Sequence, residues 1–309
     1  MRVAVTGASG FVGGAVATAL ADRGDEVLAF GRTPGGWSHP SPRAAYAVWT
    51  LPSSPPRPLE VDAVVHAAAL ADDWAPLEQA MAANRDGTVA VLAAVGSASP
   101  AARVVHISSS SVTESRGPSV REREDAPIPS RHSSPYAASK AAAEGVLVGT
   151  GALILRPHAV YGPGDRTLLP RVEAAVRGGV LRLPDGGRAR HTLTSIDALV
   201  AAVVAGLEQP AVAGVISVGD DGDVVLGDVI AEFLARRGRA ARIRAVPMPL
   251  ALAAAGAAEA TARLRGRRPA ITRYAVRQLG LEHTYDLARG RELLGLRPAA
   301  TSLAGAEHW

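Results

Sequence analysis

The sequence predicts an α/β protein built on a doubly wound parallel sheet with a smaller C-terminal lobe. Three observations support this fold class: strand-like apolar runs alternate with helical stretches, a glycine-rich turn follows the first apolar run, and the alternation loosens beyond Val160. Such alternation is typical of a parallel sheet with helices on both faces. The chain has 309 residues, 48% of them hydrophobic, which is enough for a substantial core.

The expected elements follow in chain order. Apolar runs predict strands at residues 2–5, 26–30, 61–66, 103–108, 152–155 and 214–218. Helices are expected at residues 11–23, 76–98 and 135–150, with another beginning near Ile196. Residues 33–58 are rich in Pro, Gly and Ser, which predicts an irregular connection with a short strand at residues 45–48. We expect residues 1–160, joined by residues 191–220, to form the sheet domain, and residues 161–190 and 221–309 to form a substrate-binding lobe.

Three glycines, Gly7, Gly10 and Gly13, directly follow the first strand and open the first helix. This order of strand, glycine loop and helix is the context of the Rossmann dinucleotide-binding motif. Gly7 permits the tight turn, Gly10 lets the backbone approach a pyrophosphate, and Gly13 allows close helix packing. The helix N-terminus would then face the phosphates. The other residues of the predicted cofactor-binding loop are Ser9, Phe11 and Val12.

The end of the second strand decides between two dinucleotides. An acid at that point would hold the ribose 2′-hydroxyl of NAD, but the chain reads Phe30-Gly31-Arg32 there. A guanidinium offers paired donors to the oxygens of a 2′-phosphate. We therefore expect Arg32 to make NADP(H) the preferred cofactor, with NAD(H) as the second candidate.

Tyr136 and Lys140 are four residues apart in a predicted helix and so share one face. A phenol has an ordinary pKa near 10, and a nearby ammonium stabilises the phenolate and lowers that pKa. Four serines, Ser108 to Ser111, follow the strand that precedes this helix, at the sheet edge where ligands bind. We expect hydride transfer from a nicotinamide to a carbonyl carbon, with Tyr136 as the proton donor and one serine hydroxyl donating a hydrogen bond to the oxygen.

Together these motifs resemble the extended short-chain dehydrogenase/reductase family, and the resemblance covers nearly the whole chain. Residues 62–69 are similar to the family's segment beside the adenosine, residues 84–88 to its Asn-x-x-Gly-Thr helix, and residues 156–165 to the segment that contacts the nicotinamide. The resemblance implies that Ser110 is the catalytic hydroxyl, with Ser109 and Ser111 as alternatives, and that a homodimer is the assembly to expect. It also implies cofactor contacts from Ala67, Ala68, Tyr136, Lys140, Pro157, His158 and Val160.

Two departures from the family pattern count against a nucleotide-sugar substrate. Members that act on such sugars typically carry an Asn where this chain has Ala159, and an Arg-Asp pair where it has His191-Thr192. Residues 68–74 and the sequence around Tyr161 are more similar to the 3β-hydroxysteroid dehydrogenase-like and dihydroflavonol reductase-like branches. The expected function is therefore NADP(H)-dependent interconversion of a ketone or aldehyde and an alcohol on a small, fairly apolar molecule.

Other functions stay open at this point. One is a nucleotide-sugar epimerase or 4-ketoreductase, because Arg188 or Arg190 could still reach a diphosphate. Another is a catalytically silent dinucleotide sensor, although such relatives tend to lose the Tyr and Lys. His158 and His191 are candidates for contact with substrate or nicotinamide, but a local hydrogen-bonding role is expected more often for loop histidines.

Composition argues against several other classes. The chain has no cysteine, which removes disulfides, thiolate catalysis and sulfur-ligated metals. The net charge is +4, but the arginines are scattered, so no nucleic-acid partner is expected. The basic stretch at residues 263–268 is expected to be a solvated helix end. Asp72 and Asp73 have no neighbouring histidine, so they are expected to be solvated charges, and no metal site is expected.

The two remaining expectations concern location. Residues 1–5 lead straight into the glycine loop, so no signal peptide is expected. Residues 247–262 are alanine-rich but contain Gly256 and Glu259, which favours a packing helix over a membrane span. The sequence therefore favours a cytoplasmic protein that acts on a small carbonyl or alcohol substrate.

Overall fold

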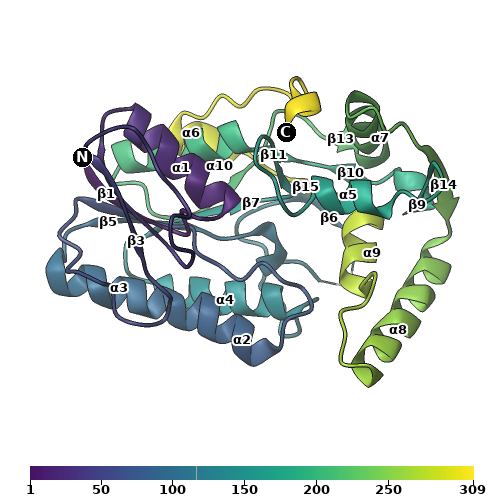
Figure 1. The fold of residues 1–309 in the computed structure, drawn as a ribbon, viewed down its shortest axis with the longest axis horizontal. Helices are drawn as coiled ribbons and strands as arrows, with labels where there is room; N and C mark the ends of the chain where they lie inside the picture. The colour runs from purple at the N-terminus through teal and green to yellow at the C-terminus, as the bar shows by residue number, and fades with distance from the viewer. Residues whose placement is uncertain (116) are drawn as a thin grey trace.

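A seven-stranded parallel sheet dominates the computed structural model, which describes residues 1–115 and 117–309 (Figure 1). Its strands are β1 (Arg2–Thr6), β2 (Glu26–Gly31), β3 (Ala44–Val48), β4 (Ala63–His66), β5 (Arg103–Ile107), β7 (Leu153–Pro157) and β12 (Gly214–Val218). Their order is β12-β7-β5-β4-β1-β2-β3, with parallel pairing throughout. The chain winds outward from β1 in one direction and then from β4 in the other, so the predicted Rossmann doubly wound fold is confirmed.

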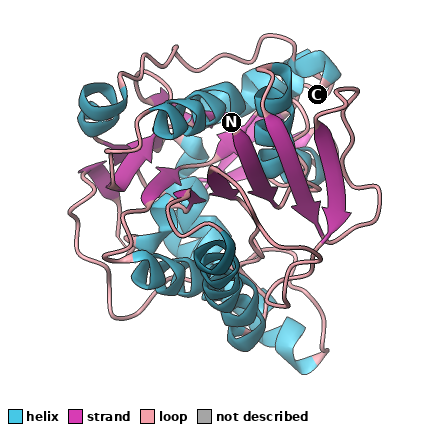
Figure 2. Ribbon diagram, turned by 90° about the vertical axis from the view of Figure 1, so that its left-hand side faces the viewer, coloured by secondary structure: helices cyan, strands magenta, loops and turns pink. Residues whose placement is uncertain are grey.

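Helices cover both faces of this sheet, and in the turned view the strands lie between helices above and below (Figure 2). One face carries α1 (Phe11–Asp22), α6 (Ile196–Glu208) and α10 (Ala288–Leu294), and the other carries α2 (Leu77–Met81), α3 (Gly87–Ala98) and α4 (Pro135–Leu147). Successive strand residues point to opposite faces. Val3 and Val5 therefore pack in one core cluster with α1, whereas Ala4 packs in another with α3.

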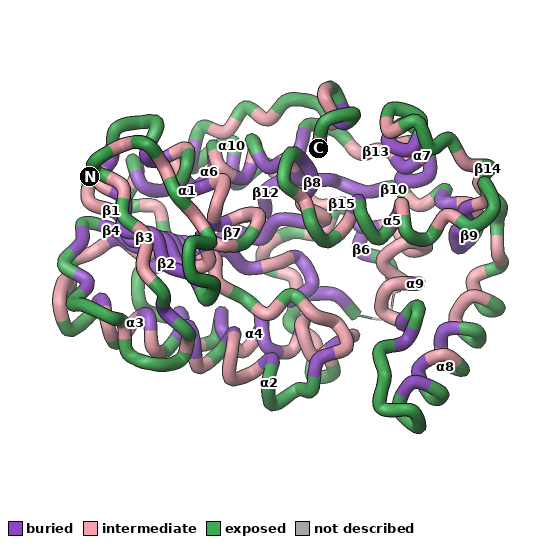
Figure 3. Tube along the Cα trace, in the orientation of Figure 1, coloured by how far each residue is buried: buried purple, intermediate pink, exposed green. Residues whose placement is uncertain are grey.

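The rest of the chain forms smaller sheets. Strands β6 (Ser119–Glu122), β10 (Arg190–His191), β13 (Val224–Val225) and β15 (His283–Tyr285) make a four-stranded sheet, and two parallel pairs join β8 (Val160–Tyr161) to β11 (Thr194–Ser195) and β9 (Val180–Pro184) to β14 (Arg242–Val246). The helices here are α5 (Leu169–Ala175), α7 (Leu226–Arg236), α8 (Met248–Leu264) and α9 (Arg273–Gly280). A separate core holds this part together, with Leu181, Leu183, Phe233 and Leu234 buried at its centre (Figure 3).

Two segments lie elsewhere than the sequence pattern suggested. Helix α10, expected in the smaller lobe, packs on β12 and α6, and its Leu294 joins the core of the large sheet. Conversely, β6 comes from the first half of the chain but pairs with β15 in the four-stranded sheet. These crossings join the two parts of the molecule through backbone hydrogen bonds and core packing.

The predicted helix over residues 76–98 is not a uniform α-helix. It begins at Leu77 and contains a π-helical turn, Ala82–Asp86, between α2 and α3. A wider turn of this kind is often found at functional sites, and here it carries Asn84. The predicted strand at residues 103–108 ends at Ile107, and the helix expected to reach residue 150 ends at Leu147. The short strand near residues 45–48 is present as β3, and the expected packing helix is α8.

No helix in the described part of the chain combines the length and the apolar character that a bilayer crossing requires.

Candidate active site

The glycine loop between β1 and α1 has no room for side chains at two of its three glycines. Gly7 has φ 78°, and a Cβ there would lie 2.7 Å from the Ala68 nitrogen. A Cβ on Gly13 would lie 2.3 Å from the Gly7 carbonyl oxygen, far inside contact distance. Larger residues would therefore force the loop away from β4 and α1.

Helix α1 begins at this loop without a side-chain cap. Its N-cap residue, Gly10, has no side chain, whereas Ser134, Ser195 and Thr272 cap α4, α6 and α9 with side-chain oxygens. The first N–H groups of a helix have no partner within the helix and attract anions. The start of α1 thus fits the pyrophosphate of a dinucleotide.

A single cavity of about 830 Å³ runs along this loop and between the two parts of the molecule. Every residue that the sequence predicted for cofactor binding lines this cavity, as do Ser108, Ser109 and Ser110, whereas Ser111 does not. The predicted cofactor residues are Gly7, Ser9, Gly10, Phe11, Val12, Gly13, Arg32, Ala67, Ala68, Tyr136, Lys140, Pro157, His158 and Val160.

Arg32 directly follows β2 and is exposed at one end of the cavity. No hydrogen bond or ion pair joins it to another residue that the structure describes. Ser9, in the glycine loop, lies next to Gly31, the residue before Arg32, because a Cβ on Gly31 would be 2.5 Å from the Ser9 hydroxyl oxygen. The guanidinium is therefore free to contact a group bound beside the glycine loop.

Lys140 is almost completely buried, with 1% of its surface exposed. Its Nζ donates to the Ile107 carbonyl oxygen at 2.6 Å and lies 3.3 Å from His106 Nε2. Burial lowers the pKa of Lys140 to about 8, although Glu144 acts in the opposite direction. This amine can therefore change its protonation state close to neutral pH.

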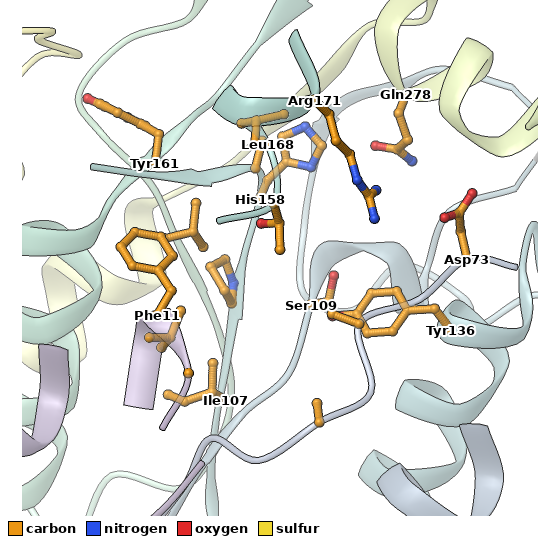
Figure 4. A pocket seen from close by; sticks show the side chains of 18 of the residues that line it. Phe11, Asp73, Ile107, Ser109, Tyr136, His158, Tyr161, Leu168, Arg171 and Gln278 are labelled. Atoms are coloured by element: carbon orange, nitrogen blue, oxygen red, sulfur yellow. The ribbon is translucent and has the colours of Figure 1, made fainter. Parts of the chain in front are cut away.

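Tyr136 is half-buried on the same helix face and lies beside Ser109 in the cavity (Figure 4). Burial raises the pKa of Tyr136, and a hydrogen bond with Ser109 lowers it by a smaller amount. The sequence analysis expected the Lys140 ammonium to lower the pKa of Tyr136. In the structure this ammonium instead donates to the Ile107 carbonyl oxygen. The phenol therefore keeps its proton at neutral pH.

The serine cluster places its hydroxyls in different surroundings. Ser110, which the resemblance favoured, is 3% exposed, and its Oγ forms a 2.9 Å hydrogen bond with His158 Nδ1. Ser109 is the serine that hydrogen-bonds with Tyr136. Ser108 Oγ donates to Glu144 Oε1 at 2.5 Å, which ties the start of the cluster to α4. These contacts distinguish the serines, which the sequence could not do.

His158 and His191 make the local hydrogen bonds that were expected of them. His158 Nε2 lies 3.1 Å from His191 Nδ1, and both rings also pack against His283. Burial lowers the pKa of His191 to about 3 and that of His283 to about 4, so these imidazoles are neutral at physiological pH. Both His158 and His191 also line the cavity. No group of three or more metal-binding side chains occurs in the described residues.

Ala159 adopts a left-handed backbone conformation, with φ 45°. Asn tolerates this conformation better than Ala does. The position where nucleotide-sugar enzymes of the family carry Asn is thus strained here, and its methyl side chain offers no hydrogen bond to a ligand.

Asn84 connects three segments around the cavity. Its Oδ1 accepts from the Leu70 backbone N–H at 2.7 Å, and its Nδ2 donates to Ser139 Oγ at 2.7 Å. Ser139 lies between Tyr136 and Lys140 on α4. The amide therefore fixes α4 relative to the loop after β4.

The expectation of solvated charge was wrong for Asp72 and Asp73, and it was incomplete for residues 263–268, which are exposed around the end of α8. Asp72 and Asp73 are not simply solvated: Arg268 donates to Asp72 at 2.8 Å and to Asp73 at 2.9 Å, and Thr272 donates to Asp73 at 2.5 Å. The end of the basic stretch at residues 263–268 is correspondingly an ion-pair partner and not only a solvated helix end. These bonds tie the loop before α2 to the segment before α9, at one wall of the cavity.

The polar residues of the cavity wall that escaped the sequence analysis include Glu114, Arg171 and Gln278. Glu114 is 2% exposed and accepts from Gln278 Nε2 at 2.5 Å. Burial raises the pKa of Glu114 to about 8, so its carboxyl group is mainly protonated at neutral pH. Only the position of Glu114, three residues after the serine cluster, could have drawn attention to it.

Comparisons with known proteins agree with this geometry. Residues 3–219 match the family described as "NAD dependent epimerase/dehydratase family". The chain is 31% identical to a 2-alkyl-3-oxoalkanoate reductase of Stenotrophomonas maltophilia, over 96% of this chain and 95% of that protein. It is 30% identical to a 4-hydroxy-2-methyl-3-oxo-4-farnesyl-3,4-dihydroquinoline-1-oxide ketoreductase of Stigmatella aurantiaca, over 99% and 95% of the two chains.

Among solved structures, the UDP-glucuronic acid 4-epimerase of Bacillus cereus in complex with NAD is similar with a TM-score of 0.76. The identity is 21%, and the match covers 99% of this chain and 94% of that one. At this identity the likeness concerns the fold.

Proposed function

Because the chain belongs to the NAD-dependent epimerase/dehydratase family and is an NAD(P)-dependent oxidoreductase, we propose that it uses NADP(H) to interconvert a ketone or aldehyde and an alcohol on a fairly apolar molecule. One observation carries this proposal. Tyr136, Ser109 and Lys140 line the same cavity as the glycine loop, and the cavity continues into an apolar region of the smaller lobe. We assign residues 1–160 and 191–220, apart from β6, to cofactor binding, and residues 161–190 and 221–309, apart from α10, to substrate binding.

The apolar region supports a substrate with hydrocarbon chains. The side chains that line it come from α5, β9, α7 and α9 and from the adjoining loops, and most are aliphatic. Apolar walls with a few convergent polar groups are typical of sites for small apolar ligands. Two relatives are named as reductases of 2-alkyl-3-oxoalkanoates and one as a farnesylated-quinoline ketoreductase, which fits this character. The lining includes Leu168, Leu169, Val172, Leu181, Leu183, Leu226, Ile230 and Leu279.

The reaction follows from the positions of the polar groups. A bound reduced nicotinamide supplies the hydride for the carbonyl carbon. Tyr136 gives its phenolic proton to the carbonyl oxygen, and Ser109 donates a hydrogen bond to the same oxygen. Lys140, with a pKa of about 8, can return a proton to the site near neutral pH. Alcohol oxidation runs through the same groups in reverse.

We propose that Ser109, and not Ser110, is the hydroxyl beside the reacting oxygen. Ser109→Ala should lower kcat about 100-fold, as expected for loss of a donor to developing oxygen charge. Ser110→Ala should change kcat less than about fivefold, because its hydroxyl is directed to His158. Steady-state rates of both variants test the assignment. A larger loss of kcat in Ser110→Ala than in Ser109→Ala would contradict this assignment and favour Ser110 as the hydroxyl beside the reacting oxygen.

Cofactor preference is proposed to depend on Arg32. Arg32→Asp should weaken NADPH binding about ten- to hundredfold, because charge-assisted hydrogen bonds to the 2′-phosphate are lost and an opposing charge is added. NADH binding should change little. Fluorescence titrations with both cofactors measure the two dissociation constants, and Arg57→Asp, a charge change outside the cavity, is the control. An unchanged ratio of NADPH to NADH affinity in Arg32→Asp would contradict the proposal.

The function itself is tested by following NADPH consumption with apolar ketones, apolar aldehydes and nucleotide-linked keto-sugars, with NADH in parallel. We expect turnover of apolar carbonyl compounds. Turnover confined to keto-sugars would instead favour the nucleotide-sugar alternative, and the absence of turnover in either direction with any of them would count against the reductase.

A further inference from the structure

We propose that Arg171 binds a carboxylate on the substrate and thereby orients its carbonyl group toward Tyr136, so that the enzyme prefers keto acids to neutral ketones. This inference rests on the proposed function and names the residue that would select the substrate class. Three observations support it: Arg171 points into the cavity, no described residue forms a hydrogen bond or ion pair with it, and the buried acid Glu114 of the cavity wall is mainly uncharged.

Arg171 lies on α5, whose neighbouring residues Leu169 and Val172 are buried in the core of the smaller lobe. Their burial holds α5 in place, so the backbone that carries Arg171 has a fixed position. It extends into the cavity from the side opposite the serine cluster, and its guanidinium points toward the space beside Ser109 and Tyr136 (Figure 4). A group bound there would lie between the guanidinium and the proposed proton donor.

No hydrogen bond or ion pair joins Arg171 to another of the described residues. Two acids are near this side of the cavity, but both have partners. Asp72 accepts from Arg268 with both oxygens, and Asp73 accepts from Arg268 and Thr272 with one oxygen each. Arg171 adds only a longer-range attraction to Asp72. Its paired N–H donors are thus free for a ligand.

Glu114 also lines the cavity wall, and it does not compete for the guanidinium either. It is buried and hydrogen-bonded to Gln278, and burial raises the pKa of Glu114 to about 8. At neutral pH its carboxyl group is therefore mainly uncharged. Ser109, Tyr136 and Leu168 contribute no charge to this part of the wall at that pH, and the Arg171 guanidinium faces it (Figure 4). The other cationic side chains of the cavity lining are Arg32, Lys140 and Arg182.

The chemistry of a guanidinium favours a carboxylate in this place. Its planar fork matches the two oxygens of a carboxylate, so that two parallel N–H···O hydrogen bonds can form. In a 3-oxo acid the carboxylate is two carbons from the ketone. Holding the carboxylate at Arg171 would therefore leave the ketone no freedom to move far from Tyr136, while the hydrocarbon chains occupy the aliphatic region.

Two measurements test this proposal, each on wild type, Arg171→Gln and a control, Arg177→Gln. Arg177 follows α5 and donates to the backbone carbonyl groups of Ala174 and Val176, outside the cavity. The first measurement is calorimetric binding of decanoate and of 1-decanol with NADP⁺ present. The second is kcat/KM for 3-oxodecanoate and for its methyl ester, which differ in the carboxylate charge.

We expect Arg171→Gln to weaken decanoate binding about ten- to hundredfold and to lower kcat/KM for the acid by a similar factor, mainly through KM. Binding of 1-decanol and reduction of the ester should change less than about threefold, and Arg177→Gln should behave as wild type. Equal affinity of wild type and Arg171→Gln for decanoate would overturn the proposal. If wild type reduced neither compound, the proposed function would fail, and the decanoate titration would still decide the role of Arg171.

Discussion

Replacing Tyr136 by phenylalanine is expected to lower kcat at least about 1000-fold while changing the dissociation constant of NADPH less than about threefold. The variant keeps the aromatic ring that fills this part of the cavity but removes the proton that the carbonyl oxygen must receive. A positioned general acid contributes about 100- to 10,000-fold to a rate. Because burial raises the pKa of Tyr136, the wild-type phenol keeps this proton at neutral pH.

The measurement compares NADPH oxidation by the two proteins under saturating substrate, with NADPH affinity from fluorescence titration. Tyr274→Phe is a suitable control, because Tyr274 also lines the cavity, whereas the hydrogen bond with Ser109 is made by Tyr136. It should retain most of the activity. A Tyr136→Phe variant with more than a tenth of the wild-type kcat would contradict the assigned acid.

Glu114→Gln is expected to remove a large part of the pH dependence of stability between pH 5.5 and 8.5. Burial raises the pKa of Glu114 from its ordinary value of 4.5 to about 8 in the folded protein. Between these pH values the folded protein holds a proton that the unfolded chain has released. The stability that comes from this group is therefore fully present below about pH 4.5 and is lost as the pH rises through 8.

As the pH rises from 5.5 to 8.5, the unfolding free energy of wild type should fall by about 3 kcal/mol more than that of Glu114→Gln. Glutamine has nearly the same shape as glutamate, and its carbonyl oxygen can still accept from Gln278. Urea unfolding of wild type, Glu114→Gln and the exposed control Glu78→Gln at several pH values measures the difference. Taking differences between variants removes the contributions of the buried histidines and of Lys140, which titrate in all three proteins. Parallel curves for wild type and Glu114→Gln would show that Glu114 does not hold its proton.

Several features of the fold and the site follow from short sequence patterns. The alternation of apolar runs predicted the strands of the large sheet, because the central strands are buried on both faces and must be apolar along their length. The spacing of Tyr136 and Lys140 predicted a shared helix face, which is a property of the α-helix itself. Gly7 and Gly13 could be interpreted in the same way, since the turn itself gives Gly7 a positive φ and a Cβ on Gly13 would meet the Gly7 carbonyl oxygen of the same loop.

Other features depend on segments that meet only in the folded chain. The interpretation of Asp72 and Asp73 as solvated charges failed because their partner, Arg268, is almost two hundred residues away and approaches only when α8 and α9 fold against the first part of the chain. The placement of α10 and β6 was missed for the same reason, because the sequence pattern of a short helix or strand does not indicate which sheet it joins. The π-helical turn at Ala82–Asp86 gives no signal in hydrophobic periodicity.

The sequence by itself determined the doubly wound sheet, the dinucleotide loop and the Tyr-Lys pair, because local backbone geometry and the period of apolar residues require nothing from distant parts of the chain. Only the tertiary structure decided which serine lies beside Tyr136, that Glu114 is a buried acid, and that Arg171 extends unpaired into the cavity. Exposure, pKa and the choice of a charged partner are set by the whole surroundings of a side chain, and those surroundings come from residues far apart in the sequence.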